Sequence, residues 1–249
     1  MTNVLVKVAY DGTCFFGYQL QQGLRTVQGA LQHALIRLHG KKVEFHAAGR
    51  TDTRVHALGQ YINIQTDMLL KDRFHYALNA YLPPDVRAMS SREVSPSFHA
   101  RYSAVKRCYQ YRCYVGTEMP PQYRNFSYLL PFMGDLERMN QDASALLGLH
   151  DFRYFATAPL QRMDTSRTIF HAAFVSEPPF LLFTISANGF LRRMVRCIVG
   201  TLLHRERLRS KKKYNIPSMK QLLQKPQHNL IGPTIEPQAL SLMEVEFDE

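Results

Sequence analysis

Residues 43 to 66 read VEFHAAGRTDTRVHALGQYINIQT, and they predict two strands joined by a charged loop. The stretches VEFHAA and GQYINIQT are rich in apolar and β-branched residues that alternate with polar ones, which is typical of half-buried strands. The loop between them places one short carboxylate, Asp52, between Arg50 and Arg54. Because functional groups often lie on loops held by a rigid frame, this loop is the first candidate for a site.

The residues before this stretch predict a strand followed by a helix. NVLVKVA, at 3 to 9, alternates as a strand does. TVQGALQHALIRLHG then carries apolar residues at helical spacing from Val27 to Leu38. Thr26 can cap the start of this helix, and Gly40 can end it.

The second half of the chain repeats this alternation of strands and helices. VKRCYQYRCYVG, at 105 to 116, predicts a strand, and GDLERMNQDASALLG predicts a helix capped by Asp135. IFHAAFVSE and FLLFTISA predict a hairpin, and LSLMEVEF predicts a closing strand. Since the strands come in adjacent pairs, we expect an α+β fold with a mainly antiparallel central sheet. We expect two α/β halves, residues 1–104 and 105–249.

The stretch NGFLRRMVRCIVGTLLHRERL predicts one helix with an apolar face and a basic face. At about 100° per residue, one arc holds a set of apolar residues: Leu191, Met194, Val195, Ile198 and Leu202. The opposite side holds a set of arginines: Arg192, Arg193, Arg196 and Arg207. After it, residues 209 to 238 are expected to form a surface link around a short helix at 218 to 225.

The chain is strongly basic, with 31 Lys and Arg against 20 Asp and Glu and a net charge of +11. The surplus is uneven, because nine Lys and Arg residues between 190 and 213, Lys211, Lys212 and Lys213 among them, accompany a single acid, Glu206. Clustered cations that neutralise phosphates dominate nucleic-acid binding, so nucleic acid is the leading partner class. The alternative is a solvated cationic face without a partner.

Several classes of protein are disfavoured. No apolar run approaches the roughly 18 residues that span a bilayer, and the first residues alternate where a leader would be apolar, so neither membrane insertion nor secretion is expected. The four cysteines are too scattered for a zinc site or a disulfide framework, which predicts reduced thiols and a cytoplasmic location. There is no phosphate loop, dinucleotide fingerprint or metal-spaced cluster, so we expect neither cofactor nor metal.

Asp52 admits two interpretations. A lone carboxylate among cations has its pKa held low, and it could act as an ionised nucleophile. The alternative is a loop aspartate that accepts hydrogen bonds from backbone amides, which is the commoner role of such a residue. His56 is likewise more often a hydrogen-bonding loop residue than a catalyst.

Six ordered blocks, taken together, resemble the TruA family of tRNA pseudouridine synthases. They are YDGTCFFGYQLQQ at 10 to 22, AGRTDTRVHALGQ, FHARYSAVKRCYQYRCY at 98 to 114, LLGLHDFRYF at 146 to 155, SRTI at 166 to 169 and ANGFLRRMVRCIVG at 187 to 200. The resemblance covers nearly the whole chain. It implies the pseudouridine synthase fold, with two ferredoxin-like α/β halves that share the sheet.

The resemblance also implies an activity. The family detaches uracil from its ribose, rotates the ring and rejoins it through carbon five, without cofactor or metal. By resemblance, Asp52 is the nucleophile and Arg50 helps to extrude the target base. Tyr109 would stack on the uracil and is the favoured group for removing the carbon-five proton, while Arg196 would pair with the aspartate.

Further expectations follow from the same resemblance. The family acts as a homodimer on the anticodon stem-loop of tRNA. We assign a set of further substrate-binding positions: Arg54, His56, Arg192, Arg193 and Leu240. For Arg192 and Arg193 the alternative is a solvated surface. Two other functions stay open, a non-catalytic tRNA-binding or chaperone protein, and a synthase of the same fold that acts on another RNA.

The chain departs from the family pattern at four places. Arg54 stands where the family loop has a glycine, which is the residue expected where φ is positive. Tyr18 replaces a usual tryptophan, Leu20 a usual arginine and Ala239 a usual glycine. These changes affect the expected substrate range more than the chemistry.

Overall fold

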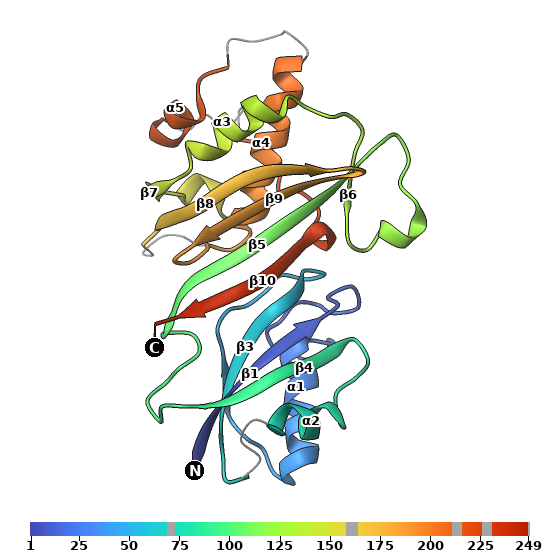
Figure 1. Cartoon of the computed structure of the whole chain (residues 1–249), viewed down its shortest axis with the longest axis vertical. Coiled ribbons are helices and arrows are strands. Elements are labelled where there is room, and N and C mark those ends of the chain that lie inside the picture. The colour runs from blue at the N-terminus through green and yellow to red at the C-terminus, as the bar shows by residue number, and fades with distance from the viewer. Residues whose placement is uncertain (69–72, 158–163, 211–215, 226–230, 249) are drawn as a thin grey trace. The chain divides into compact units, whose positions relative to one another are not determined.

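The chain forms two compact units, which are described one at a time (Figure 1). The computed structural model describes residues 1–68, 73–157, 164–210, 216–225 and 231–248. The first unit is Met1–Arg107 together with the chain from Ser241 onward, and the second is Cys108–Leu240. The division predicted from the sequence lies at 104 and 105 and gives the closing strand to the second half.

The first unit alternates strands and helices in a ferredoxin-like order. Its elements are β1 (Thr2–Tyr10), α1 (Val27–His39), β2 (Phe45–Ala47), β3 (His56–Thr66), α2 (Phe74–Asn79) and β4 (Val86–Val94). The hydrogen-bonded strand order is β4-β1-β3, with β2 beside β3, and all of these pairs are antiparallel. The two helices contact each other, and α2 contacts β4.

Helix α1 forms as its sequence predicts. The side chain of Thr26 accepts a hydrogen bond from the backbone N–H of Gly29, which satisfies one of the free amides at the helix start. Gly40 ends the helix in the left-handed conformation, with φ 69°, and its N–H donates to Ile36. Leu31 and Leu35 are fully buried, so the predicted apolar face is the buried face of the helix.

The closing strand β10 (Leu240–Phe247) joins the first unit through β3. Ser241 and Leu242 pair in parallel with His56 and Ala57. On β3, the short strand β2 pairs instead with residues 62 to 64. The last strand in the sequence is thereby tied to the residues that follow the Asp52 loop.

The second unit contains the rest of the chain's elements. They are β5 (Ala104–Val115), which begins in the first unit, β6 (Tyr128–Leu130), α3 (Leu136–Ser144), β7 (Gly148–Asp151), β8 (Ser166–Glu177), β9 (Phe180–Ala187), α4 (Met194–Ser210) and α5 (Met219–Gln224). Three short 3-10 turns are Pro121–Tyr123, Arg153–Phe155 and Pro237–Ala239. The strand order is β5-β9-β8-β7, with β6 parallel to β5. Helix α3 contacts β8, α4 and α5, which lie together in Figure 1.

Helix α4 corrects one prediction. It begins at Met194, whereas the sequence pattern placed Leu191, Arg192 and Arg193 inside the same helix. Arg193 has φ 61°, a left-handed conformation that cannot continue an α-helix. The predicted apolar residues are nevertheless buried, so the packing face was identified correctly even though the start of the helix was not.

The predicted fold class is confirmed. The ten strands in the described residues are mainly antiparallel, and the helices fall between strand pairs in both units. The short helix expected at 218 to 225 is α5, which starts with a capping box between Ser218 and Gln221. No helix in the described ranges is long and apolar enough to cross a membrane.

Candidate active site

The Asp52 loop is held against a second loop, residues 11–18, in the first unit. The backbone N–H of Tyr18 donates to the carbonyl of Thr51 at 3.0 Å, and the N–H of Arg54 donates to the carbonyl of Phe15 at 3.2 Å. The two bonds involve loop residues before and after Asp52 in the sequence. The loop that carries the carboxylate is therefore fixed by the chain rather than free in solvent.

Two glycines allow the loops to approach this closely. A Cβ at Gly12 would overlap the backbone carbonyl of Val55. A Cβ at Gly17 would lie 3.1 Å from the carbonyl oxygen of Thr51, and Gly17 also has φ 90°. Any other residue at Gly12 would push the Asp52 loop away, and at Gly17 it would meet a tight contact in a strained backbone conformation.

Buried polar side chains of β1 and β3 support the same loop. The hydroxyl of Tyr10 lies 2.8 Å from the hydroxyl of Thr51, and the side-chain amide of Gln60 donates to the carbonyl of Gly49 at 3.0 Å. Burial raises the pKa of Tyr10 to about 12, although hydrogen bonds with Thr51 and Gln60 act in the opposite direction. The phenol is therefore neutral at physiological pH and available for hydrogen bonding.

Tyr18, which stands in place of the family tryptophan, is also buried beside this loop. Its hydroxyl makes no hydrogen bond within the described part of the chain. Burial raises its pKa well above the ordinary value, the nearby Tyr10 raises it further, and Arg50 lowers it.

The charged residues of the loop differ in exposure. Asp52 is half-buried, whereas Arg50 and Arg54 are exposed. Arg54 has φ 64°, so the position where the family has glycine does adopt the left-handed conformation that the sequence comparison suggested. The loop thus presents two guanidinium groups to solvent on either side of a partly shielded carboxylate.

His56 supports the loop that precedes β3. Its ring is only 3% exposed, and Nδ1 accepts a hydrogen bond from the N–H of Gly12 at 3.0 Å. A carboxylate oxygen of Asp11 lies 3.2 Å from the same nitrogen. That oxygen also accepts hydrogen bonds from the N–H and hydroxyl of Thr13, so the bond from Gly12 helps to orient the ring.

Tyr109 lies on β5 in the second unit and is half-buried. Its ring meets the ring of Phe190 edge to face, with centroids 5.3 Å apart. Further along the same face of β5, Tyr111 and Cys113 are fully buried. Tyr109 is therefore more accessible to solvent than its two neighbours on this face of the strand.

Arg196 is oriented by the segment that precedes β10. Its Nε donates to the carbonyl of Ile235 at 2.7 Å. A Cβ at Gly200, one turn further along α4, would overlap the carbonyl oxygen of Pro233. The N–H of Gly232 donates to the hydroxyl of Thr201 at 3.0 Å. Close contact at Gly200 thus brings this segment near enough to hold the guanidinium.

The other predicted positions of the second unit differ in exposure. Arg192 and Arg193 are exposed just before α4, and the carbonyl of Arg192 accepts from the N–H of Thr157. Leu240 is 5% exposed at the start of β10. Among the described residues, Arg54 and Arg193 are the two non-glycine residues with positive φ. Both are candidate substrate-binding residues, Arg54 in the first unit and Arg193 in the second.

The basic residues that follow Arg196 give the surface less positive charge than the sequence indicates. Arg205 is fully buried and, with Arg209, binds both carboxylate oxygens of Asp142 from α3. Glu206 pairs with Arg138 at 2.7 Å. Two of the nine cations are therefore structural, and Lys211, Lys212 and Lys213 lie outside the described residues.

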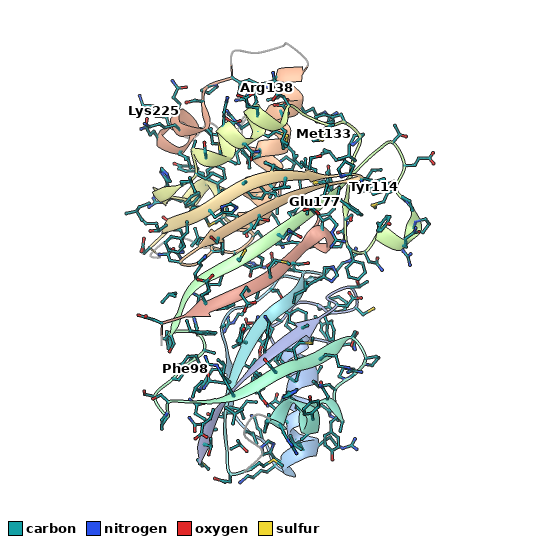
Figure 2. The ribbon with its side chains drawn as sticks, in the orientation of Figure 1. Phe98, Tyr114, Met133, Arg138, Glu177 and Lys225 are labelled. Carbon is teal, nitrogen blue, oxygen red and sulfur yellow. The ribbon has the colours of Figure 1, made fainter. Side chains whose placement is uncertain are left out.

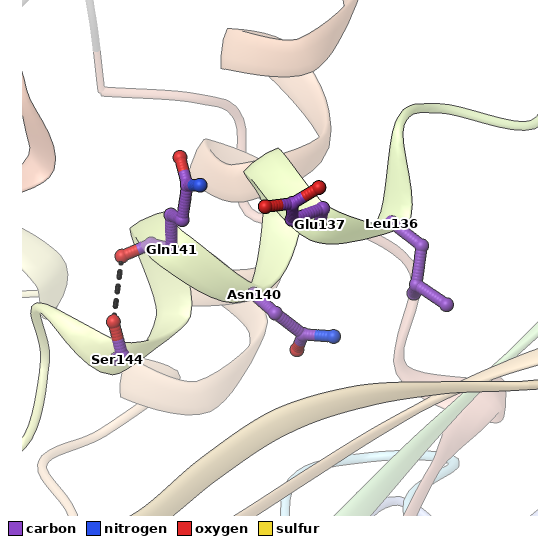
Figure 3. Close-up of a pocket in the computed structure, with 5 residues that line it drawn as sticks. All are labelled: Leu136, Glu137, Asn140, Gln141 and Ser144. Atoms are coloured by element: carbon purple, nitrogen blue, oxygen red, sulfur yellow. Dashed lines mark hydrogen bonds between the residues drawn. The ribbon is translucent and has the colours of Figure 1, made fainter.

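Two surface hollows among the described residues are lined by residues other than the predicted ones. One is a shallow depression on the exposed side of α3, lined by Leu136, Glu137, Asn140, Gln141 and Ser144 (Figure 3). Another lies in the first unit near His46 and His99. Within the described ranges, no group of three or more His, Cys, Asp or Glu side chains could hold a metal ion.

Comparison with known proteins defines the class first. A family model described as tRNA pseudouridine synthase matches residues 7–103 and 143–248. The chain belongs to this family of RNA-modifying enzymes, which confirms the predicted family and enzyme class. Asp52 and Arg196 lie within the matched ranges, whereas Tyr109 lies between them.

Individual relatives match over most or all of the chain. The tRNA pseudouridine synthase A of Anoxybacillus flavithermus is 40% identical over 250 residues and covers 100% of both chains. The protein of the same name from Treponema denticola is 38% identical, covering 99% of this chain and 93% of the relative. The one from Halalkalibacterium halodurans is 44% identical over 82% of this chain and 78% of the relative.

A solved structure titled "Crystal Structure of a Cbf5-Nop10-Gar1 Complex" matches with a TM-score of 0.36 and 8% identity, over 96% of this chain and 57% of that one. A TM-score of this size does not by itself establish a common fold.

Sequence reasoning missed the residues that support the Asp52 loop. Tyr10 and Gln60 looked like ordinary strand residues, and Gly12 and Gly17 were noted only as part of a family block. These residues act through contacts between segments that are distant in the sequence, since Tyr10 is 41 positions from Thr51. The available signal was the pair of glycines, Gly12 and Gly17, within one short block of the sequence.

Proposed function

We propose that this protein converts uridine to pseudouridine in the anticodon stem-loop of tRNA, with Asp52 as the nucleophile. The observation that carries the proposal is the Asp52 loop, which backbone hydrogen bonds to residues 11–18 hold in place. It keeps a half-buried carboxylate between two exposed arginines. Family membership supports the reaction, and the positive charge of the chain suits a phosphate-rich substrate.

The proposed reaction is an isomerisation that needs no co-reactant. The bond between ribose C1′ and uracil N1 breaks, the ring rotates, and a bond forms between C1′ and carbon five. The proton leaves carbon five, and N1 gains one. Asp52 forms a transient covalent bond either to the ribose or to the uracil and is released as a carboxylate, so atoms and charge balance.

Three other side chains have proposed roles. A uridine inside a stem must be unstacked before an enzyme can reach it, and Arg50 would occupy the space that the base leaves. Tyr109 would stack on the extruded uracil and remove the carbon-five proton. Arg196 would pair with the Asp52 carboxylate and keep it ionised.

Substrate binding is proposed at a second set of positions. Arg54, Arg192 and Arg193 are exposed and would bind phosphates of the tRNA. His56 and Leu240 are nearly buried, so any contact of theirs with the substrate would be through one edge of the side chain. We further propose that the protein works in the cytoplasm as a homodimer, as the family does, and that tRNA is positioned more by its shape and phosphates than by its sequence.

The test is to incubate the purified protein with unmodified tRNA transcripts and to map pseudouridine by position. We expect pseudouridine in the anticodon stem-loop with the parent protein. With Asp52→Ala and Asp52→Asn we expect none, while tRNA affinity survives because phosphate contacts supply most of it. Turnover by Asp52→Ala would contradict the nucleophile role. Tight tRNA binding without product from the parent would favour a tRNA-binding protein, and product only in another RNA would favour a different substrate.

A further inference from the structure

A row of planar side chains, none of them assigned a role above, lies on the surface of the first unit. The rings of His46 and His99 stack with centroids 4.3 Å apart, and the ring of Tyr102 lies 4.4 Å from that of His99. The guanidinium of Arg101 lies over the ring of Tyr102 at 5.7 Å. Tyr102 is 76% exposed, so most of its ring meets solvent. We call His46, His99, Tyr102 and Arg101 the aromatic row.

Buried amides hold the backbone beneath the aromatic row. Asn63 of β3 accepts a hydrogen bond from the N–H of Ala100 and donates to the carbonyl of Phe98, which Figure 2 labels. Asn3 of β1 also donates to Phe98 and, in addition, to Ser95. Both asparagines are at most 3% exposed, and they bind each other.

An arginine fixes the other end of the same loop. The guanidinium of Arg107 donates to the carbonyls of Ala104, Arg101 and Ala48. Buried polar side chains stabilise a unique conformation only when they are fully hydrogen-bonded, as these amides are. The loop is therefore held in one conformation although it exposes a large aromatic side chain, Tyr102, and no packing need explains that tyrosine.

There is space for a ligand next to this row. His46 and His99 line a surface hollow of about 790 Å³, whose rim also carries Lys41, Lys42 and the backbone near Phe98. Aromatic faces beside a hollow with two lysines are a combination that suits a nucleobase and its phosphate. Glu44 and Asp67, which also line the hollow, make it less suitable for a free polyanion that lacks a base to stack.

The histidine at the centre of the row is uncharged at neutral pH. Nδ1 of His99 accepts from the N–H of Arg101 at 3.1 Å. Partial burial lowers its pKa below the ordinary value, and the neighbouring His46 and Arg101 lower it further, against a backbone hydrogen bond that raises it. A neutral imidazole stacks on a base as an aromatic ring does.

We propose that the aromatic row binds an unpaired nucleotide of the RNA substrate, with its base stacked on Tyr102 and its phosphate beside Arg101 or Lys42. This inference rests on the proposed function. His46 lies on β2, six positions before Asp52, so the two residues are at most about 20 Å apart along extended chain. At this distance the aromatic row would bind a nucleotide a few positions away from the uridine that reacts. That contact would set which uridine of the RNA reaches Asp52.

The first experiment compares two exposed tyrosines. Tyr76, on α2, is 69% exposed and its ring lies 4.0 Å from the tilted ring of His75, so it matches Tyr102 in exposure and in having a histidine neighbour. We expect Tyr102→Ala to raise the Kd for tRNA by about five- to a hundredfold, as the loss of one stacked base does. Tyr102→Phe should keep parental affinity, because it keeps the ring. Equal affinities for Tyr102→Ala and Tyr76→Ala would overturn the proposal.

A second experiment removes the base instead of the ring. Ligated tRNAs carrying one abasic nucleotide, placed in turn at each unpaired position of the anticodon loop, are titrated against the parent and Tyr102→Ala. At one position the abasic change should weaken binding to the parent about tenfold and leave binding to Tyr102→Ala unchanged, because the stacked pair is already lost. The same penalty in both proteins at every position would overturn the proposal.

Pseudouridine formation is measured in parallel. If the parent forms no product, the proposed function fails, and the two binding experiments still decide whether the aromatic row binds RNA. If the parent forms product while both binding experiments give parental values, only the inference about the aromatic row fails.

Discussion

The hydroxyl of Tyr10, at the end of β1, lies 2.8 Å from the hydroxyl of Thr51, the residue immediately before Asp52. Both residues are buried, so this bond joins the rigid sheet of the first unit to the loop that carries the proposed nucleophile. Tyr10 touches neither the uridine nor Asp52 in the proposed reaction. Its contribution would be to hold the loop in position.

We predict that Tyr10→Phe lowers kcat for pseudouridine formation and leaves the Kd for tRNA near the parental value. The buried Thr51 hydroxyl loses its partner, which should lower the free energy of unfolding by about 1–3 kcal/mol. Single-turnover rates, tRNA titrations and urea unfolding measure the three quantities. If Tyr10 acts through Thr51, the double variant with Thr51→Val should cost less than the sum of the single variants. Additive losses would contradict this coupling.

Arg54 allows stability and RNA binding to be separated. A left-handed conformation costs a non-glycine residue about 1–2 kcal/mol, and the greater freedom of an unfolded glycine offsets part of that gain. We expect Arg54→Gly to raise the free energy of unfolding by up to about 1 kcal/mol, while tRNA binding weakens and its salt dependence flattens. Arg54→Lys keeps the charge and the strain, so it should keep the salt dependence without the gain in stability. Unchanged salt dependence in Arg54→Gly would argue against a phosphate contact.

Local periodicity was enough to predict most of the fold. The bounds of α1, the hairpin of β8 and β9 and the strand β10 all follow from residues that are close in the sequence. The start of α4 was wrong because a left-handed Arg193 leaves the spacing of apolar residues unchanged. The burial of Arg205 was missed because its partner, Asp142, is 63 positions away. For the site, the Asp52 loop was predictable from its motif, whereas the glycines and the tyrosine that lock it act through contacts between distant segments.

Gly200 tests how Arg196 is held. Helix propensity alone favours alanine over glycine by about 1 kcal/mol, so a neutral packing environment would make Gly200→Ala stabilising. Because the added Cβ would overlap the carbonyl oxygen of Pro233, we expect the opposite, a loss of about 1–3 kcal/mol in the free energy of unfolding. Product formation should fall as well, because the segment that binds the Arg196 Nε is displaced. A variant more stable than the parent would show that this segment moves away at little cost.

The proposed reaction also predicts independence from metal ions. The carboxylate, the base-stacking ring and the arginines supply all of its steps, so a chelator should not reduce the rate of pure enzyme on tRNA that has been folded beforehand. The measurement compares turnover with and without chelator after removal of free magnesium. Loss of turnover that a divalent ion restores, with the tRNA still folded, would contradict the mechanism.

The last prediction concerns the pH dependence of stability through Asp142. Burial raises the pKa of this carboxyl group, but hydrogen bonds and charges from Arg205 and Arg209 outweigh burial, and the net result is a pKa below the ordinary value. A group whose pKa is lower in the folded state contributes stability above its unfolded pKa, near 3.9, and loses it as the pH falls through the folded value. The contribution of Asp142 should therefore be complete above about pH 5 and decline below about pH 4.

Asp142→Asn removes this titration. At neutral pH it leaves the fully buried Arg205 without its carboxylate, so we expect a loss of about 3–5 kcal/mol in the free energy of unfolding. Between pH 5 and about pH 3 the variant should lose less stability than the parent does, because its side chain takes up no proton. Urea unfolding across this range measures both effects. Glu246→Gln serves as the control, since its pair with Lys106 is solvent-exposed and worth little. Parallel pH profiles for the parent and Asp142→Asn would show that the acid sensitivity of the fold lies in other carboxylates, and that the two arginines are held by the packing of α3 against α4 rather than by this charge.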